Sequence, residues 1–377
     1  MSKDKKRLVP VRRFKEFENA PAWEQRKLGE VVEITMGQSP SSKNYTENPN
    51  DHILVQGNAD MKNGHVVPRV WTTQITKQAE KGDLILSVRA PVGDIGKTDY
   101  DVVLGRGVAA IKGNSFIFQL LTKMKINGYW TRFSTGSTFE SINSDNIKNA
   151  QISIPSLREQ EKIGGLFNEF DSLIALHQRK LDKLKRVKSA YLTEMFPAEG
   201  EREPKRRFPG FTVAWEQRKL GEITKTHSFK QYISEAFDHG KYMVIQQGEN
   251  PIAGYANGDP FENFKDVTLF GDHTLSLFKP QEKFFVASDG IKILSPSLKM
   301  NGMFYYYLLE KYRPQSEGYK RHFTIMKKST ALFPIEIDEQ IKISNFLEEL
   351  DSLIALHQCK LDKLKKMKAA YLEEMFV

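Results

Sequence analysis

Apolar residues in one stretch of the chain step by three and four, the spacing of a helix that packs on another helix. A helix over residues 158–195 would be about 57 Å long at 1.5 Å per residue, too long to bury its apolar stripe on one compact domain. The sequence therefore predicts a partner helix. The step of four plus four from Leu173 through His177 to Leu181 predicts a local stutter in this stripe. The stripe consists of Ile163, Leu166, Phe170, Leu173, Leu181, Leu184, Val187 and Tyr191.

The chain supplies the partner itself, because the same stretch occurs twice. Residues 171–196 and 351–376 differ at five of 26 positions, and neither copy contains Pro or Gly. Both copies are rich in Leu, Lys, Ala, Glu and Met, which favour helices. The five differing pairs are Arg179/Cys359, Arg186/Lys366, Val187/Met367, Ser189/Ala369 and Thr193/Glu373.

A second motif also occurs twice, before the region that precedes each helix. Residues 23–30 and 215–222 both read WEQRKLGE, and similar lead-ins precede them at 13–17 and 207–211. A period this long indicates a duplicated domain rather than a solenoid. The predicted divisions are a basic tail (1–22), a first domain (23–157), a long helix (158–196), an exposed linker (197–214), a second domain (215–337) and a second long helix (338–377).

The regions between the repeated motifs read as strands and turns. Short β-like runs alternate with polar, glycine-bearing loops, and each region also contains one helical run. The two regions barely align, although the motifs around them are nearly identical. A duplicated frame with dissimilar inserts indicates one task performed on two targets. In the first region the predicted strands are 31–34, 52–55, 83–88, 101–104 and 108–111. The predicted helical run is 115–127 in the first region and 300–311 in the second.

Composition narrows the class of partner. The chain has 377 residues, a formal charge of +9 and one cysteine, Cys359. The positive excess favours an anionic partner, with nucleic acid ahead of a membrane surface. A single cysteine excludes an internal disulfide framework and suits a cytoplasmic location. The basic N-terminus has no apolar core like that of a signal peptide, and no apolar run is long enough to span a membrane.

Catalytic motifs are incomplete. The nearest approach to a methyltransferase base-binding loop, Asp259-Pro260-Phe261, lacks one proline. Gly96-Lys97-Thr98 could end a phosphate-binding loop, but Pro91 stands where its first glycine is required. No two histidines have the His-x-x-x-His spacing of a metal site. We therefore expect no catalysis, metal or cofactor in this chain.

The repeated motifs resemble those of the DNA-specificity subunit of Type I restriction–modification enzymes. The resemblance covers essentially the whole chain and rests on WEQRKLGE, on the DSLIALHQ helix, and on a Pro followed by Glu-Gln before each helix (Pro155 with Glu159-Gln160, Pro334 with Glu339-Gln340). It implies two strand-rich α/β target-recognition domains separated by a long antiparallel two-helix coiled coil with pseudo-twofold symmetry. Each domain would read one half of a bipartite site in double-stranded DNA.

The resemblance also implies partner subunits. Two methyltransferase subunits would dock on the helical frame, and motor-nuclease subunits would join them for cleavage. S-adenosylmethionine, ATP and Mg²⁺ would belong to those partners. A coiled-coil scaffold with two protein-binding domains is the alternative from another class, and a stand-alone nuclease is a second.

Loop residues are the candidates for DNA contact, because base edges are read by forked donors and acceptors and phosphates by cations, hydroxyls and backbone N–H groups. The helix cations are weaker candidates, since they could form a solvated face. The candidates are Gln38, Ser39, Lys43, Tyr45, Gln56, Asn58, Arg89, Arg106, Ser137, Thr138 and Asn143 in the first domain, and His227, Lys230, Gln246, Gln247, Asn250, Tyr319, Lys320 and Arg321 in the second.

His177 and His357 occupy matching positions near the midpoints of the two helices. If the helices are antiparallel about a twofold axis, the two imidazoles should meet at the centre of the coil. A polar layer that fixes the register of the helices explains these histidines better than a functional site does.

Overall fold

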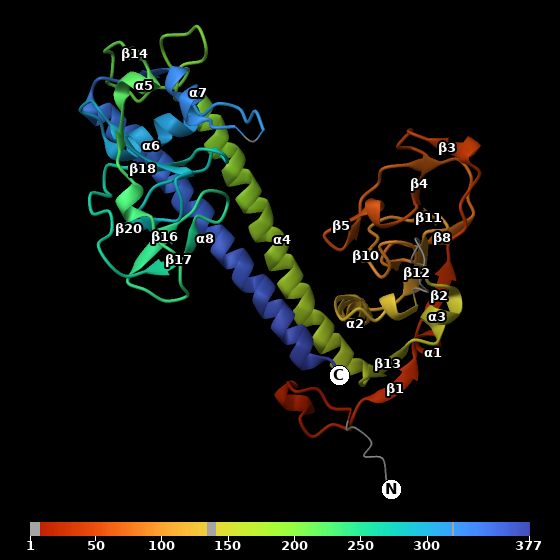
Figure 1. Ribbon diagram of the computed structural model, residues 1–377. Helices are drawn as coiled ribbons and strands as arrows, with labels where there is room; N and C mark the ends of the chain where they lie inside the picture. Colours follow the sequence, from red (N-terminus) through yellow and green to blue (C-terminus); the bar gives the residue numbers. More distant parts are fainter. Residues whose placement is uncertain (1–7, 134–140, 319) are drawn as a thin grey trace. The chain divides into compact units, whose positions relative to one another are not determined.

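The computed structural model describes residues 8–133, 141–318 and 320–377, which form two compact units. The first comprises Met1–His177 with Lys360–Val377, and the second Gln178–Cys359. Two long helices, α4 (Leu157–Glu194) and α8 (Ile337–Met375), are each divided between the units (Figure 1). Each unit therefore consists of a strand-rich domain and a part of each helix.

Within each unit the two helix segments run antiparallel, because partners that come later along α4 come earlier along α8. The contacts are aromatic pairs and ion pairs. In the first unit Phe170 contacts Tyr371 and Asp171 binds Lys368, and in the second Lys188 binds Asp351 and Tyr191 contacts Phe346. The prediction of antiparallel long helices is confirmed.

The apolar stripe of α4 differs from the predicted one near His177. Leu173 is exposed, whereas Ile174 and His177 are half-buried. Phe170, Ile174, His177 and Leu181 are spaced by four, three and four residues, which is a regular heptad. The predicted stutter is therefore wrong. His177 belongs to the first unit and His357 to the second, so their pairing stays a prediction.

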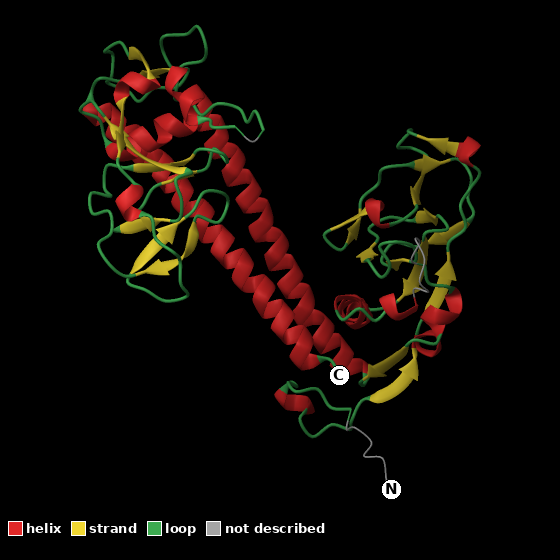
Figure 2. Cartoon of the chain, viewed as in Figure 1, coloured by secondary structure: helices red, strands yellow, loops and turns green. Residues whose placement is uncertain are grey.

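The first domain contains a six-stranded sheet (β2-β12-β9-β10-β6-β5), a five-stranded sheet (β3-β7-β4-β11-β8) and the ribbon β1-β13 (Figure 2). Its strands are β1 (Glu24–Lys27), β2 (Glu33–Met36), β3 (Tyr45–Thr46), β4 (His52–Val55), β5 (Met61–Lys62), β6 (His65–Val66), β7 (Trp71–Thr72), β8 (Lys77–Ala79), β9 (Leu84–Ser87), β10 (Ile95–Lys97), β11 (Val102–Leu104), β12 (Val108–Lys112) and β13 (Gln151–Ile154). Its helices are α1 (Leu28–Val31), α2 (Ser115–Ile126) and α3 (Ser144–Lys148).

The core of the first unit contains residues from both ends of the chain. Helix α2 begins where Asn114 Oδ1 accepts a hydrogen bond from Ile117 N–H, and its apolar face packs under the six-stranded sheet. Phe376 stacks on Phe116 of this helix with ring centroids 5.0 Å apart. It also meets Trp23 edge-on. The C-terminal end of α8 is therefore part of the first domain's core.

The second domain follows the same plan with fewer strands. Its sheets are β14-β22, β15-β21-β18-β19 and β17-β16-β20. The strands are β14 (Glu216–Lys219), β15 (Thr224–His227), β16 (Tyr242–Ile245), β17 (Ile252–Ala256), β18 (Thr268–Gly271), β19 (Leu277–Phe278), β20 (Phe284–Val286), β21 (Ile291–Pro296) and β22 (Thr330–Phe333). The helices are α5 (Leu220–Ile223), α6 (Gly302–Lys311) and α7 (Phe323–Lys328). Here Phe196, from the end of α4, stacks on Phe304 of α6 with centroids 5.8 Å apart.

Two local predictions need correction. Residue 31 ends the helical turn α1 rather than beginning a strand, because Leu28 is fully buried and its carbonyl accepts Val32 N–H. The linker is not exposed throughout. Pro197 is buried, and the Arg207 side chain is largely covered because it pairs with Glu339. Among the described helices, none is long and apolar enough to cross a membrane.

Candidate nucleic-acid interface

The Trp of WEQRKLGE and the Glu in the first turn of each long helix meet in a buried anchor. In the first unit Glu159 accepts hydrogen bonds from Arg13 Nε and Nη2, both at 2.7 Å, and from Trp23 Nε1 at 3.3 Å. The guanidinium also donates to the Ala20 and Pro21 carbonyls. The Glu159 carboxylate raises the pKa of Arg13. This anchor fixes the domain's first strand to the first turn of α4.

The second unit contains the same anchor with different residue numbers. Glu339 accepts hydrogen bonds from Arg207 Nε at 2.7 Å, Arg207 Nη2 at 2.8 Å and Trp215 Nε1 at 3.3 Å. The Gln that follows each Glu is bound as well. Gln160 Nε2 donates to Pro155 O, and Gln340 Nε2 donates to Pro334 O. The Trp of WEQRKLGE and the Glu-Gln pair of each repeat therefore have structural roles.

Loops of the first domain converge at a crowded junction. A Cβ on Gly37 would lie 2.1 Å from Gly105 O, and one on Gly107 would lie 2.1 Å from Gln56 O. Neither position can carry a side chain without moving the neighbouring backbone. The loops after β2, β4 and β11 are therefore held in backbone contact.

Backbone hydrogen bonds show that both domains build this junction in the same way. Matching bonds join three segments: the one after β9 or β18, the loop after β11 or β20, and the one before α3 or α7. The loop after β11 or β20 is also bonded to the end of β4 or β16. In the first domain the bonds are Gly105 N–H to Val55 O (2.7 Å), Val88 N–H to Gly107 O (2.9 Å) and Ile142 N–H to Val88 O (3.0 Å). In the second they are Ala287 N–H to Ile245 O, Asp272 N–H to Gly290 O and His322 N–H to Asp272 O, each 2.8 Å. We call this arrangement the three-loop junction.

Most candidate residues of the first domain lie on the three-loop junction or on the loops after β2 and β4, which contact it. Ser39 Oγ accepts Arg106 N–H at 3.0 Å, and Gln56 Nε2 donates to Tyr45 Oη at 2.9 Å. Gln38 and Arg106 are exposed. Asn58 lies in the loop after β4, and Arg89 is exposed next to Val88, beside the junction. Lys43 is exposed in the short 3₁₀ turn Ser42–Asn44, before β3. Asn143 caps α3 through its side-chain oxygen, which accepts Asn146 N–H at 2.9 Å, so a structural role accounts for it.

In the second domain the candidates are more scattered. Gln247 lies at the junction, where its side-chain oxygen accepts His273 N–H, and Gln246 binds the Asn250 carbonyl. His227 Nε2 pairs with Ser295 Oγ at 2.8 Å inside the sheet, and burial lowers its pKa, with a smaller contribution from Lys225. Lys230 is exposed in the turn Lys230–Tyr232, and Lys320 pairs with Glu317. Ser137, Thr138 and Tyr319 lie outside the described residues.

Arg321 is exposed on a loop that buried His322 holds in place. The His322 ring accepts Glu317 N–H through Nε2, so its Nδ1–H donates to Asp272 O. Arg321 Nη2 lies 3.8 Å from Asp289 Oδ2. Sequence reasoning did not select Asp289, although it occupies the loop equivalent to that of Arg106. The signal is an apolar strand followed by a glycine-bearing loop, Val102 to Gly107 and Phe284 to Gly290.

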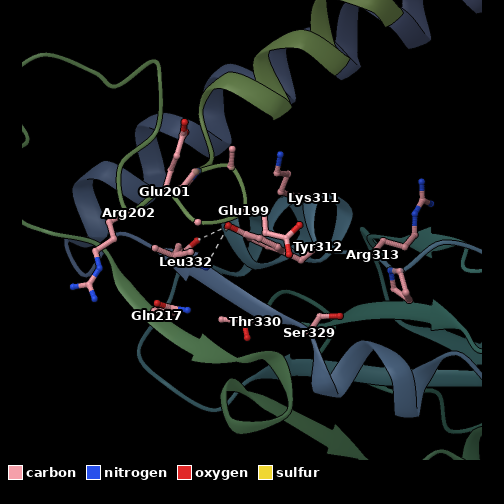
Figure 3. Close-up of a pocket in the computed structure, with 14 residues that line it drawn as sticks. Glu199, Glu201, Arg202, Gln217, Lys311, Tyr312, Arg313, Ser329, Thr330 and Leu332 are labelled. Atoms are coloured by element: carbon pink, nitrogen blue, oxygen red, sulfur yellow. Dashed lines mark hydrogen bonds between the residues drawn. The ribbon is translucent and has the colours of Figure 1, made fainter.

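A cavity of about 730 Å³ lies elsewhere in the second unit, under the linker (Figure 3). Its lining mixes Arg202, Lys311 and Arg313 with Glu199 and Glu201. The Tyr312 hydroxyl donates to the Leu332 carbonyl and accepts Leu332 N–H. Charges of both signs line this cavity, so the lining indicates no particular ligand. No group of His, Cys, Asp and Glu able to hold a metal ion occurs among the residues with described positions.

The chain matches a known family twice. The family described as "Type I restriction modification DNA specificity domain" matches residues 21–186 and 212–366, one match per repeat. These matches cover most of the chain. The protein belongs to this family of type I restriction–modification specificity proteins.

Two curated relatives come from Methanocaldococcus jannaschii. A putative type I restriction enzyme MjaX specificity subunit is 30% identical over 174 residues, which are 44% of this chain and 40% of the relative. The type I restriction enzyme MjaIX specificity subunit is 24% identical over 229 residues, which are 55% of this chain and 52% of the relative. The matched segments span about half the length of these relatives or less.

Solved structures share the fold. The type I restriction–modification S subunit of M. genitalium aligns with a TM-score of 0.74 at 15% identity, covering 98% of this chain and 99% of that one. A chain from a study of assembly and conformational transition of the type I restriction–modification system aligns with a TM-score of 0.50 at 18% identity, covering 94% and 98%. At these identities the likeness concerns the fold.

Proposed function

We propose that this protein is the sequence-specific DNA-binding subunit of a type I restriction–modification complex and reads a bipartite target, one half-site per domain. One observation carries the proposal. The anchors and the three-loop junction are the same in both domains, while the side chains on the loops differ. A duplicated frame that presents two different sets of loop side chains suits two unlike half-sites separated by a fixed gap.

The long helices are the part of the chain suited to hold partners. Two repeats of nearly identical helix sequence offer two equivalent surfaces, which suits two copies of one methyltransferase subunit. Restriction subunits would join that assembly. The partner subunits would then bind S-adenosylmethionine, ATP and Mg²⁺. The complex would work in the cytoplasm, where its DNA is. This chain itself would be non-catalytic.

The test is to purify the chain with the methyltransferase subunits of its host and to map the adenines methylated in random DNA. We expect methylation within two short, unlike half-sites separated by a constant number of unspecified base pairs. A continuous target without a gap, or methylation without sequence preference, would contradict the proposal.

The alternative, a scaffold with two protein-binding domains, differs in its response to salt. Binding to duplex DNA should weaken steeply between 50 and 200 mM salt, because phosphate contacts release counterions. Binding to a protein partner need not. A nuclease would cleave DNA as an isolated chain with Mg²⁺, and we expect no such cleavage.

A further inference from the structure

The matching bonds of the three-loop junction identify equivalent positions in two domains whose sequences barely align. Gly107 corresponds to Gly290 and Gly105 to Ala287, because each pair makes the same backbone bond. Between them stands Arg106 in the first domain, and Ser288 and Asp289 in the second, where the loop is one residue longer.

Two further positions follow from the same bonds. Arg89 comes directly after Val88, and His273 comes directly after Asp272, so these two side chains are equivalent. Ser141 precedes Ile142, and Arg321 precedes His322, so these are equivalent as well. The junction therefore presents Arg89, Arg106 and Ser141 in the first domain, and His273, Ser288, Asp289 and Arg321 in the second.

The charge of the junction differs between the domains. Arg106 is exposed on a loop that its own backbone N–H fixes to Ser39. In the second domain the guanidinium is that of Arg321, in the segment before α7. The loop that corresponds to that of Arg106 carries the carboxylate of Asp289. Asp289 and Arg321 are both about 70% exposed, with 3.8 Å between their charged atoms.

A carboxylate at this position argues against a surface that only binds phosphate. Asp289 would repel the phosphate backbone, whereas a carboxylate beside Arg can orient the guanidinium. Arg321 is also held from the other side, since buried His322 and the Asp272 carbonyl fix the backbone next to it. A preorganised guanidinium is suited to the O6 and N7 acceptors of guanine.

We propose that the three-loop junction is the base-reading site of each domain, with Arg106 and Arg321 as the specificity-determining residues that bind guanine and Asp289 as the positioning residue for Arg321. This inference rests on the proposed function and names the residues that carry it out. Each half-site would then contain a G·C pair whose guanine is read by one arginine.

The experiment maps methylation of random DNA by the complex of the chain with its methyltransferase subunits. Arg106→Ala should lower the preference for one G·C pair in one half-site by about 10- to 100-fold and leave the other half-site unchanged. Arg321→Ala should do the same in the other half-site. Arg106→Lys should retain binding to unrelated DNA without restoring discrimination, because Lys cannot form the two-pronged contact.

Asp289→Asn separates positioning from folding. It should lower the preference for the same G·C pair as Arg321→Ala does, but by a smaller factor. The thermal unfolding of the complex should stay the same. Lys81→Ala and Lys265→Ala are the matched controls. Each removes one exposed cation from the loop at the opposite end of β9 or β18, and each should leave both half-sites unchanged.

The outcomes separate the two proposals. If the wild-type complex methylates a bipartite target and neither Arg106→Ala nor Arg321→Ala changes a half-site, the junction is not the reading site. An equal loss of binding to cognate and unrelated DNA would show that the arginine contacts phosphate. That result would also overturn the base-reading role of the junction. If the wild-type complex shows no sequence preference, the proposed function itself is wrong.

Discussion

At the scale of single residues, the buried anchors hold each domain against its long helix. Glu159 is almost completely buried, and its carboxylate receives three hydrogen bonds. A buried charge that loses its partner is costly, because neither water nor another charge replaces the interaction. The anchor accounts for the Trp that opens WEQRKLGE in both repeats, since Trp23 and Trp215 each donate to the buried Glu.

We expect Glu159→Gln to destabilise the first unit by about 3 kcal/mol, because Arg13 would keep its charge without its main partner. Urea unfolding of the full chain measures the change. Glu80→Gln is the control, since the Lys112–Glu80 pair is exposed, and it should leave the unfolding curve unchanged. Equal curves for wild type and Glu159→Gln would show that the anchor contributes nothing.

Lys279 provides a pH-dependent test in the second unit. Its Nζ donates to the Lys265 and Val267 carbonyls, and burial lowers its pKa from 10.5 to about 8. Between pH 8 and 10 the unfolded chain keeps this proton while the folded chain releases it. The free energy of unfolding contributed by Lys279 should therefore rise across that interval.

The measurement is the difference in unfolding free energy between wild type and Lys279→Met at pH 7, 8, 9 and 10. Other groups titrate equally in both proteins and cancel in the difference. Wild type should gain stability relative to the variant as the pH rises. A flat difference would show that Lys279 titrates normally.

At the scale of elements, each domain is completed by one aromatic side chain from the end of a long helix. Phe376 and Phe196 occupy equivalent positions, stacked on Phe116 and Phe304. Both are nearly inaccessible to solvent. The helices are therefore part of the domain cores and not only spacers.

Phe376→Ala should destabilise the first unit by about 3–5 kcal/mol through the cavity it leaves. Phe196→Ala should act in the same way on the second unit. Limited proteolysis with identification of the first cleavage sites assigns the loss to a unit. Deleting the exposed Val377 is the control and should change nothing. Cleavage that begins in the same unit for both Phe variants would contradict this assignment.

The long helices could be predicted from sequence because their period extends over ten turns and Pro155 and Pro334 mark where they begin. Apolar strands such as β4, β9, β11 and β12 could be predicted approximately. Polar strands such as β1 and β14 could not, because their side chains show no apolar run. The three-loop junction could not. It depends on bonds between residues about 50 positions apart, such as Val55 with Gly105 and Val88 with Ile142. The correspondence of Arg106 with Ser288 and Asp289 was also hidden, because one loop is a residue longer than the other.

At the scale of the whole molecule, a common frame with two different inserts makes the domains interchangeable parts. The anchors and helix ends are nearly the same in both units, so an insert from a relative meets the same contacts. The side chains at the junction belong to the insert. Specificity should therefore move with the insert and stability should remain with the frame.

Replacing residues 23–157 with the matching region of a relative should change one half of the methylated target and leave the other half intact. Replacing residues 215–337 is the reciprocal control and should change only the other half. Methylation mapping in random DNA reads out both. An exchange that alters both halves together would contradict the modular interpretation.

The insertion of Phe376 into the first domain also concerns the order in which the protein is made. The ribosome synthesises the first domain's strands early but adds Phe376 only after the whole second domain. The second domain, whose buried core residues lie within 195–350, can close before Phe376 is made. A chain truncated between residues 351 and 375 should therefore carry a folded second domain and an incomplete first one.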